Sequence, residues 1–285
     1  MQEKERPPLP NSFGLRLEQA FAKHGHLCVG IDPHESLLIE WGLPDNAEGL
    51  LSFSRTVLAA AEGRVGIVKP QVSFFERFGS RGYAVLESIT HEAKEAGLLV
   101  IADAKRGDIG TTMSAYLEAW LGRNSELYAD ALTVSPYLGA GVYIDQFAPY
   151  LERGKGLFSL VATSNPEGRQ LQETAAHEQW RALQMANSVT SGPGENLGSF
   201  GAVIGATIAT TDYGFELDVA AGPKTPILAP GFGAQGARLA DAKRIFGQYS
   251  GAVIASVSRS VLEAGPLGLE SAIEDHKQEL AKALS

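Results

Sequence analysis

Short apolar runs alternate with longer segments of mixed polarity along most of the chain. Each run is rich in Val, Ile and Leu and is too short for a core helix, so we interpret the runs as buried parallel strands. They lie at 27–32, 65–70, 98–105, 131–136, 156–164, 201–207, 226–231 and 252–258. The pattern therefore predicts a framework of eight strands.

Most gaps between these runs carry apolar residues at helical spacing, as in 48–63, 83–97 and 237–248. A strand followed by a helix, repeated eight times, is typical of a closed parallel barrel surrounded by helices. We therefore predict the α/β class and a single (β/α)8 TIM barrel. An amphipathic helix at 11–25 is expected to cap the barrel floor, and another at 269–284 to close the outer ring.

The predicted barrel forms one domain, because no Gly/Ser-rich or charged linker divides the chain. We assign residues 12–285 to this domain and the polar, Pro-rich segment 1–11 to a mobile N-terminal tail. The longest connection, 165–199, contains a helical stretch and then the glycine-rich segment 191–199. Its sequence is equally consistent with a lid over the barrel mouth and with surface decoration.

Composition narrows the range of partners. The formal net charge of −9 argues against a broad positive surface for nucleic acid or anionic lipid. No apolar segment is long enough for a membrane span, and we expect no signal peptide. Cys28 is the only cysteine and lies in an apolar run, so we predict a packing thiol and a reducing, cytoplasmic setting.

Charged residues stand at the ends of the first three predicted strands, where a barrel gathers its chemistry. Asp32 ends the first strand, Lys69 the second, and Asp103 and Lys105 the third, with Asp108 in the loop that follows. Alternation along the strand places Asp103 and Lys105 on one face. The alternative is that these charges form a solvated rim around the barrel mouth. A rim does not explain charged residues within apolar strands, where burying an unpaired ion is costly.

A glycine-rich turn at 231–236 follows the seventh strand, and Arg259 follows the eighth. Barrels of this kind commonly hold phosphate at these two loops, where glycines let backbone N–H groups approach an anion. Arg259 would supply a bidentate cation and Gln235 a further donor. The turn also matches the dinucleotide fingerprint G-x-G-x-x-G, but it lies at the seventh strand and no acidic residue ends the next one.

Other catalytic signatures are weak. The six histidines show no metal-ligand spacing, so we predict no metal site. Serine residues occur without a G-x-S-x-G elbow, which argues against an acyl-transfer hydrolase.

Five segments together resemble the orotidine 5′-monophosphate decarboxylase family, in particular its longer bacterial branch. They are GIDP from Gly30, KPQVSFFERFG from Lys69, DAKRGDIGTT from Asp103, APGFGAQG from Ala229 and SVSR from Ser256. The resemblance implies a cofactor-free carboxy-lyase of de novo pyrimidine biosynthesis. Such an enzyme converts orotidine 5′-monophosphate to uridine 5′-monophosphate through a C6 carbanion, here stabilised and protonated by Lys105.

The resemblance also implies roles for individual positions. Asp103, Lys105 and Asp108 would surround the reacting carbon, while Lys69 and Asp32 would bind the ribose and join the charged network. The remaining positions would contact other parts of the nucleotide: Thr112, Ser164 at the pyrimidine edge, Pro230 in the pocket wall, and Gln235 and Arg259 at the phosphate. One departure is that Gly236 and Ala237 stand where some members carry a phosphate-binding tyrosine.

Family members are homodimers, so the resemblance implies that Asp108 and Thr112 reach the neighbouring subunit's ligand. Two other functions remain open. One is a metal-dependent sugar-phosphate decarboxylase, lyase or epimerase on a related barrel, which would lose activity to a chelator. The other is a phosphate-binding barrel without catalysis, which would bind uridylate and leave orotidylate unchanged.

Overall fold

The structure is a computed structural model that describes residues 11–217 and 222–285. The predicted mobile tail at 1–11 lies, apart from Asn11, outside the described residues. No helix of the described ranges is long and apolar enough to cross a membrane.

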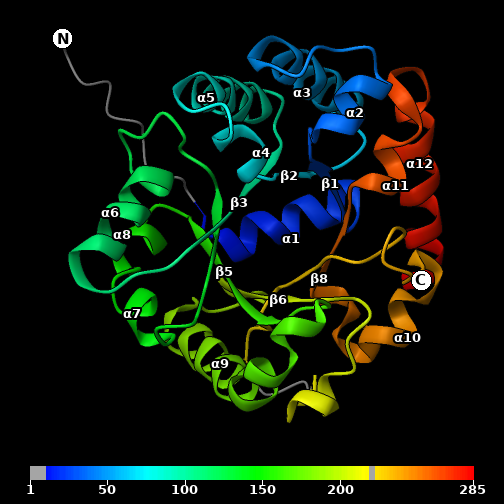
Figure 1. Ribbon diagram of the computed structural model, residues 1–285. Coiled ribbons are helices and arrows are strands. Elements are labelled where there is room, and N and C mark those ends of the chain that lie inside the picture. Colours follow the sequence, from blue (N-terminus) through cyan, green and yellow to red (C-terminus); the bar gives the residue numbers. More distant parts are fainter. Residues whose placement is uncertain (1–10, 218–221) are drawn as a thin grey trace.

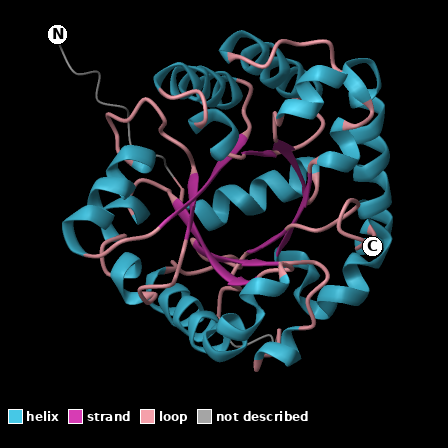
Figure 2. Ribbon diagram, in the orientation of Figure 1, coloured by secondary structure: helices cyan, strands magenta, loops and turns pink. Residues whose placement is uncertain are grey.

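Eight parallel strands close into a barrel at the centre of the molecule, as Figure 2 shows. In chain order they are β1 Leu27–Ile31, β2 Ile67–Pro70, β3 Leu99–Arg106, β4 Ala131–Val134, β5 Gly156–Ala162, β6 Phe200–Ile204, β7 Ile227–Ala229 and β8 Val253–Val257. Each strand pairs with the next, and β8 pairs with β1 to complete the ring. The predicted (β/α)8 barrel and its eight strands are confirmed.

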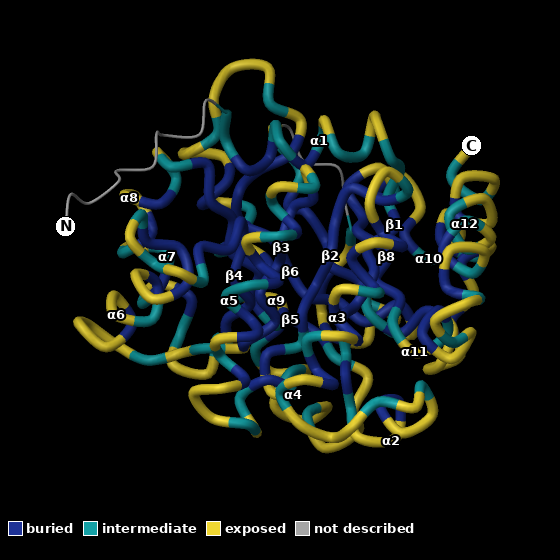
Figure 3. Tube along the Cα trace, turned by 90° about the horizontal axis from the view of Figure 1, so that it is seen from above, coloured by how far each residue is buried: buried dark blue, intermediate teal, exposed yellow. Residues whose placement is uncertain are grey.

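Helices surround the barrel (Figure 1). The α-helices are α1 Phe13–His24, α2 Glu35–Glu40, α3 Ala47–Ala61, α4 Ser73–Glu76, α5 Ser80–Glu95, α6 Gly110–Leu121, α7 Gly141–Ile144, α8 Ala148–Leu151, α9 Arg169–Thr190, α10 Ala242–Phe246, α11 Arg259–Leu262 and α12 Gly265–Leu284. In the described residues four 3₁₀ helices complete the set: η1 Pro166–Gly168, η2 Thr210–Tyr213, η3 Leu239–Asp241 and η4 Gly247–Ala252. The strands and inner helix faces are buried, and exposed residues lie at the periphery (Figure 3).

Helix α1 lies across the end of the barrel at which the strands begin (Figure 1), as predicted for a floor helix. Ser12 caps it by accepting a hydrogen bond from the backbone N–H of Leu15. The Phe13 ring packs edge-on against the Phe158 ring at a centroid distance of 5.8 Å. A Cβ on Gly156 would lie 2.5 Å from the Phe13 ring. The absence of a side chain at the start of β5 therefore allows α1 to pack against the barrel.

The connection 165–199 is mainly a regular barrel helix. Helix α9 packs against β5 and β6 and buries Trp180 and Leu183. The glycine-rich segment 191–199 that follows runs to the barrel floor, where Glu18 of α1 accepts the backbone N–H of Leu197. This part of the chain therefore lies at the opposite end from the mouth and is not a lid.

Candidate active site

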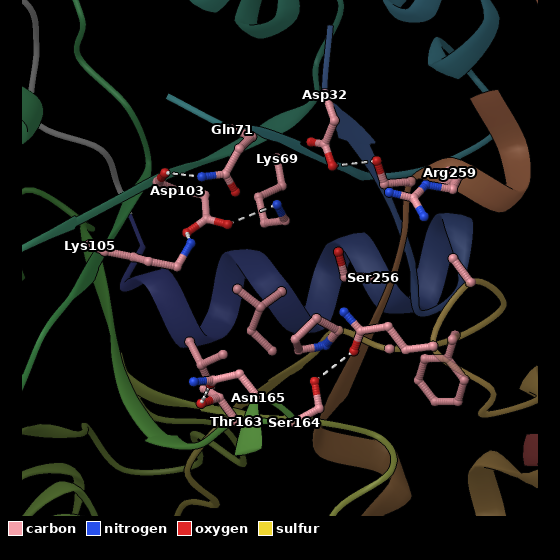
Figure 4. A pocket seen from close by; sticks show the side chains of 18 of the residues that line it. Asp32, Lys69, Gln71, Asp103, Lys105, Thr163, Ser164, Asn165, Ser256 and Arg259 are labelled. Atoms are coloured by element: carbon pink, nitrogen blue, oxygen red, sulfur yellow. Dashed lines mark hydrogen bonds and ion pairs between the residues drawn. The ribbon is translucent and has the colours of Figure 1, made fainter. Parts of the chain in front are cut away.

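A cavity of about 440 Å³ opens where the strands end, and side chains from seven of the eight strands or the loops after them line it (Figure 4). The predicted site residues that line it are Asp32, Lys69, Asp103, Lys105, Ser164, Pro230, Gln235 and Arg259. Asp108 and Thr112 do not. Additional polar and aromatic lining residues are His34, Gln71, Phe74, Thr163, Asn165, Phe232, Ser256 and Ser258.

Asp103 lies between two lysines on one side of the cavity (Figure 4). Its Oδ2 accepts a hydrogen bond from Lys69 Nζ at 2.9 Å, and its Oδ1 accepts one from Lys105 Nζ at 2.6 Å. Lys69 and Asp103 are buried, whereas the Lys105 side chain is 44% exposed and faces the cavity. Each carboxylate oxygen therefore has a cationic partner, and both lysines line the cavity, with Lys105 the more exposed of the two.

The opposite charges keep this buried array ionised. Burial by itself would raise the pKa of the Asp103 carboxyl, but Lys69 and Lys105 outweigh burial and bring its pKa well below its usual range. Burial would likewise lower the pKa of Lys69, but Asp103 and Asp32 outweigh it, so the pKa of Lys69 is raised. The cavity wall thus carries fixed charges at neutral pH.

Asp32 directly follows β1 and has one carboxylate oxygen without a hydrogen-bond partner in the described part of the chain. Its Oδ2 accepts a hydrogen bond from the Ser258 hydroxyl, while Oδ1 is buried without a hydrogen-bond partner among the described residues. Gly30 makes this arrangement possible, because a Cβ there would lie 2.8 Å from the Ser258 Cβ. A buried carboxylate oxygen of this kind is suited to accept a hydrogen bond from a ligand hydroxyl.

The glycine-rich turn after β7 lies across the cavity from Lys105, beside Arg259 (Figure 4). Gly231, Gly233 and Gly236 all have positive φ, at 109°, 75° and 98°, a conformation that glycine adopts at little cost. Gln235 lies in the same turn and accepts a hydrogen bond of 2.8 Å from the Ser164 hydroxyl. Backbone N–H groups and a guanidinium in this position are suited to bind an anion.

Asp108 and Thr112 lie outside the cavity of their own chain. The Asp108 Oδ1 accepts the backbone N–H of Ile109 at 2.8 Å, just before α6. Thr112 is exposed in the first turn of α6. Their predicted role at the ligand of a neighbouring subunit stays a prediction.

Sequence reasoning missed several lining residues for identifiable reasons. Ser258 directly follows β8 and Gln71 directly follows β2, so the strand-end argument that selected Arg259 and Lys69 applied to both. His34 lies in the loop that follows β1 and Phe74 lies in the short helix α4 that follows β2, and no local pattern distinguishes them from packing residues. In the described ranges, no three His, Cys, Asp or Glu side chains are grouped so that they could hold a metal ion.

Comparison with known proteins agrees with this geometry. Residues 25–272 match the model of the orotidine 5′-phosphate decarboxylase / HUMPS family. Over 257 residues, covering 89% of this chain and 91% of the relative, the sequence is 51% identical to orotidine 5′-phosphate decarboxylase of Streptomyces coelicolor. The enzyme of that name from Salinispora arenicola is 49% identical over 258 residues, with 90% and 91% covered.

Solved structures show the same relationship. The crystal structure of a Streptomyces avermitilis protein assigned as an orotidine 5′-phosphate decarboxylase superposes with a TM-score of 0.90 at 46% identity, covering 100% of this chain and 99% of that one. The structure of Leishmania donovani OMP decarboxylase superposes with a TM-score of 0.73 at 27% identity, covering 96% and 98%. The chain belongs to the orotidine 5′-phosphate decarboxylase / HUMPS family.

Proposed function

We propose that this protein decarboxylates orotidine 5′-monophosphate to uridine 5′-monophosphate, a step of pyrimidine biosynthesis. The observation that carries the proposal is the Asp103 carboxylate held between two ammonium groups whose lysines both line a nucleotide-sized cavity. The 51% identity to a relative of that name, over nearly the whole chain, supports the same reaction.

The cavity orients the nucleotide by its charges. The phosphate binds at Arg259 and the glycine turn, where cationic and backbone donors converge. The ribose hydroxyls lie between Asp32, whose Oδ1 lacks a hydrogen-bond partner within the described residues, and the ammonium of Lys69. This orientation brings the pyrimidine carboxylate to Lys105, and Ser164, hydrogen-bonded to Gln235, lies where it can contact the other edge of the ring.

The chemistry requires a cation at the reacting carbon. When the bond from ring carbon C6 to the carboxylate breaks, CO2 leaves and the electron pair remains in the ring plane, where the π system cannot delocalise it. The Lys105 ammonium stabilises this pair electrostatically and then donates a proton to C6, giving uridylate. Solvent returns a proton to Lys105. Asp103 holds the ammonium in place throughout, through the 2.6 Å contact.

The substrate carboxylate also lies near the Asp103 carboxylate in this orientation. Two like charges about 4 Å apart repel by roughly 4 kcal/mol at an effective dielectric near 20. Relief of that repulsion would raise the rate by about three powers of ten, which is less than a very slow uncatalysed reaction requires. We therefore assign the larger share of catalysis to stabilisation of the carbanion by Lys105.

The proposal includes a homodimer in which Asp108 and Thr112 complete the site of the neighbouring subunit. Three exposed apolar side chains on the loops that follow β3 and β4 support it. Ile109 is 59% exposed, Tyr137 75% and Leu138 48%. Large apolar side chains exposed beside a cavity mouth are typical of a protein interface.

We also propose that the enzyme works in the cytoplasm. The free cysteine, Cys28, is buried in β1, and burial raises the pKa of its thiol to about 12. A thiol with that pKa is almost entirely protonated at neutral pH, which fits the packing role expected in a reducing compartment.

The test follows the ultraviolet absorbance of orotidylate with purified protein in the presence of EDTA. Wild-type protein should convert the orotate chromophore to uracil, and Lys105→Ala should reduce kcat by at least about a thousandfold, because both the cation and the proton donor are lost. Lys23→Ala, an exposed lysine on α1 at the barrel floor, is the matched control and should behave as wild type.

Two outcomes would indicate a different function. Activity that disappears with EDTA and returns with Mg²⁺ would indicate a metal-dependent lyase. Binding of uridylate without any change in orotidylate would indicate a binding protein. Normal turnover by folded Lys105→Ala would remove the role assigned to this lysine.

A further inference from the structure

Strand β3 carries a bulge at the residues that form the charged array. The pairing of β3 with β4 shifts register between Ala102 and Arg106, so the segment 103–105 stands opposite a single β4 residue, Thr133. Within this bulge Lys105 has a φ of 49°, and it is the only non-glycine residue of the described chain with positive φ. A lysine pays a steric cost in this left-handed conformation, so neighbouring contacts must hold it there.

Thr133 supplies those contacts through one hydroxyl group. Its Oγ1 accepts the backbone N–H of Lys105 at 2.9 Å and lies 3.0 Å from the Asp103 Oδ1, to which it donates. The other acceptor in reach, the carbonyl of Ala102, is farther away at 3.5 Å. The hydroxyl therefore takes the place of a missing strand partner for Lys105 and at the same time orients the carboxylate that binds the Lys105 ammonium.

We infer that Thr133 is a positioning residue for catalysis: its hydroxyl holds the strained backbone of Lys105 and the carboxylate of Asp103 so that the Lys105 ammonium points into the cavity. The inference rests on the proposed function, in which this ammonium faces the reacting carbon. The Thr133 hydroxyl then fixes Lys105 at two places. It binds the Lys105 backbone N–H directly, and it holds the Lys105 ammonium through Asp103 Oδ1.

Thr133 acts only through other residues. It is fully buried and does not line the cavity, so it has no direct route to the nucleotide. Its loss should therefore leave ligand affinity nearly intact and reduce the rate of the chemical step. A purely structural threonine would instead lower stability without separating kcat from KM.

Three variants test the inference. Thr133→Val keeps the shape and removes the hydroxyl, while Thr133→Ser keeps the hydroxyl. Thr225→Val is the matched control, because Thr225 is also fully buried and hydrogen-bonded, to the Asn187 side chain, but lies just before β7 at the barrel floor. Measurements are kcat and KM for orotidylate, the affinity for uridylate, and the melting temperature.

We expect Thr133→Val to lower kcat by roughly 10- to 100-fold, because a small displacement of a catalytic group has an effect of this size. KM and uridylate affinity should change by less than about threefold, and Thr133→Ser should recover kcat to within about threefold of wild type. Thr225→Val should lower the melting temperature and leave kcat unchanged. Wild-type kcat in Thr133→Val, or equal loss in Thr133→Ser or in Thr225→Val, would overturn the inference.

A crystal structure of Thr133→Val without ligand separates this inference from the proposed function. We expect Lys105 to leave the left-handed region, or its ammonium to leave the Asp103 carboxylate. Unchanged geometry at both places would overturn the inference even in an active enzyme. If wild-type protein did not convert orotidylate, the proposed function would fail, while the structure of the variant would still decide whether Thr133 positions Lys105.

Discussion

Contacts with residues outside the cavity hold the glycine-rich turn in place. Gly233 of the glycine turn lies directly against Ser260, which follows Arg259 in α11. Ser260 is itself held, because its hydroxyl lies 3.1 Å from Nε2 of His276, whose Nδ1 lies 2.7 Å from the Ala272 carbonyl oxygen. The turn and Arg259 are thus packed as one unit against α12.

Gly233→Ala should disturb this unit. The new Cβ would lie 2.6 Å from the Ser260 Cβ, at a φ of 75°. We expect KM for orotidylate to rise by roughly tenfold or more with a smaller change in kcat, because phosphate binding is remote from the bond that breaks. Orotidine, which lacks the phosphate, should react equally with variant and wild type. The readout is steady-state kinetics with both substrates.

Gly63→Ala is the control for Gly233→Ala. Gly63 has a similar φ of 72°, but a Cβ there meets nothing within 4 Å and the residue lies between α3 and β2. Backbone strain alone should therefore lower stability and leave KM unchanged. An equal rise of KM in both variants would show that the contact with Ser260 is irrelevant.

Among the secondary-structure elements, α1 is joined to the barrel by a buried ionic cluster. Asp130, just before β4, accepts a hydrogen bond of 2.6 Å from Arg16 of α1 and one of 2.9 Å from the backbone N–H of Val100 in β3. Lys155 is fully buried nearby and donates to the Ala129 carbonyl at 2.6 Å. Burial would raise the pKa of Asp130, but Arg16, Lys94 and Lys155 outweigh it, and the pKa is lowered.

Asp130→Asn should destabilise the protein by roughly 3–5 kcal/mol at pH 7, because it leaves buried cations without their anion. A lowered pKa in the folded state means that the ionised carboxylate contributes stability above its unfolded pKa of about 3.9, and that this contribution is lost as the pH falls further. Wild type should therefore lose more stability than the variant between pH 7 and about pH 3. Urea unfolding at several pH values measures both effects.

Asp241→Asn provides the matched control for Asp130→Asn. Asp241 also has a lowered pKa, about 2, because the exposed side chains of Arg238 and Arg244 hydrogen-bond to it. Solvent screens an exposed pair, so this substitution should change the free energy of unfolding little. If the two variants lost equal stability, burial of the α1 cluster would not be the cause.

In the molecule as a whole, the cavity lacks two of the residues that the proposed function assigns to the active site. Asp108 and Thr112 lie outside that cavity, close in sequence to the exposed Ile109. A two-fold dimer would bury this apolar surface and give each subunit the same contribution to its neighbour.

Co-expression of Lys105→Ala with Asp108→Asn tests shared sites. Each variant alone should be nearly inactive. In a hybrid dimer one site would combine the intact Lys105 of one subunit with the intact Asp108 of the other, so a random mixture should recover about a quarter of the wild-type sites. Two copies of the same variant, expressed in the same way, provide the baseline, and sedimentation reports the oligomeric state. Recovery no greater than that baseline in a confirmed dimer would show that the sites are not shared.

The sequence by itself determined the barrel and most of its candidate site. Strands buried on both faces must be apolar, so eight short apolar runs with intervening helices indicated the fold. Parallel strands in a barrel all end at one mouth, so Asp32, Lys69, Asp103 and Lys105 could be placed together without coordinates. The family motifs then suggested the ligand for the glycine turn and Arg259.

The tertiary structure decided what depends on register and on contacts between distant segments. Thr133 could not be linked to Lys105 from the sequence, because their contact depends on a bulge in β3 and on backbone conformation that hydrophobic patterning does not encode. The connection 165–199 looked equally suited to a lid and to surface decoration, and only the packing of α9 on β5 and β6 showed that its glycine-rich end, 191–199, lies at the barrel floor. Local patterns record which residues are buried, whereas the neighbour of each buried residue is set by how the strands align.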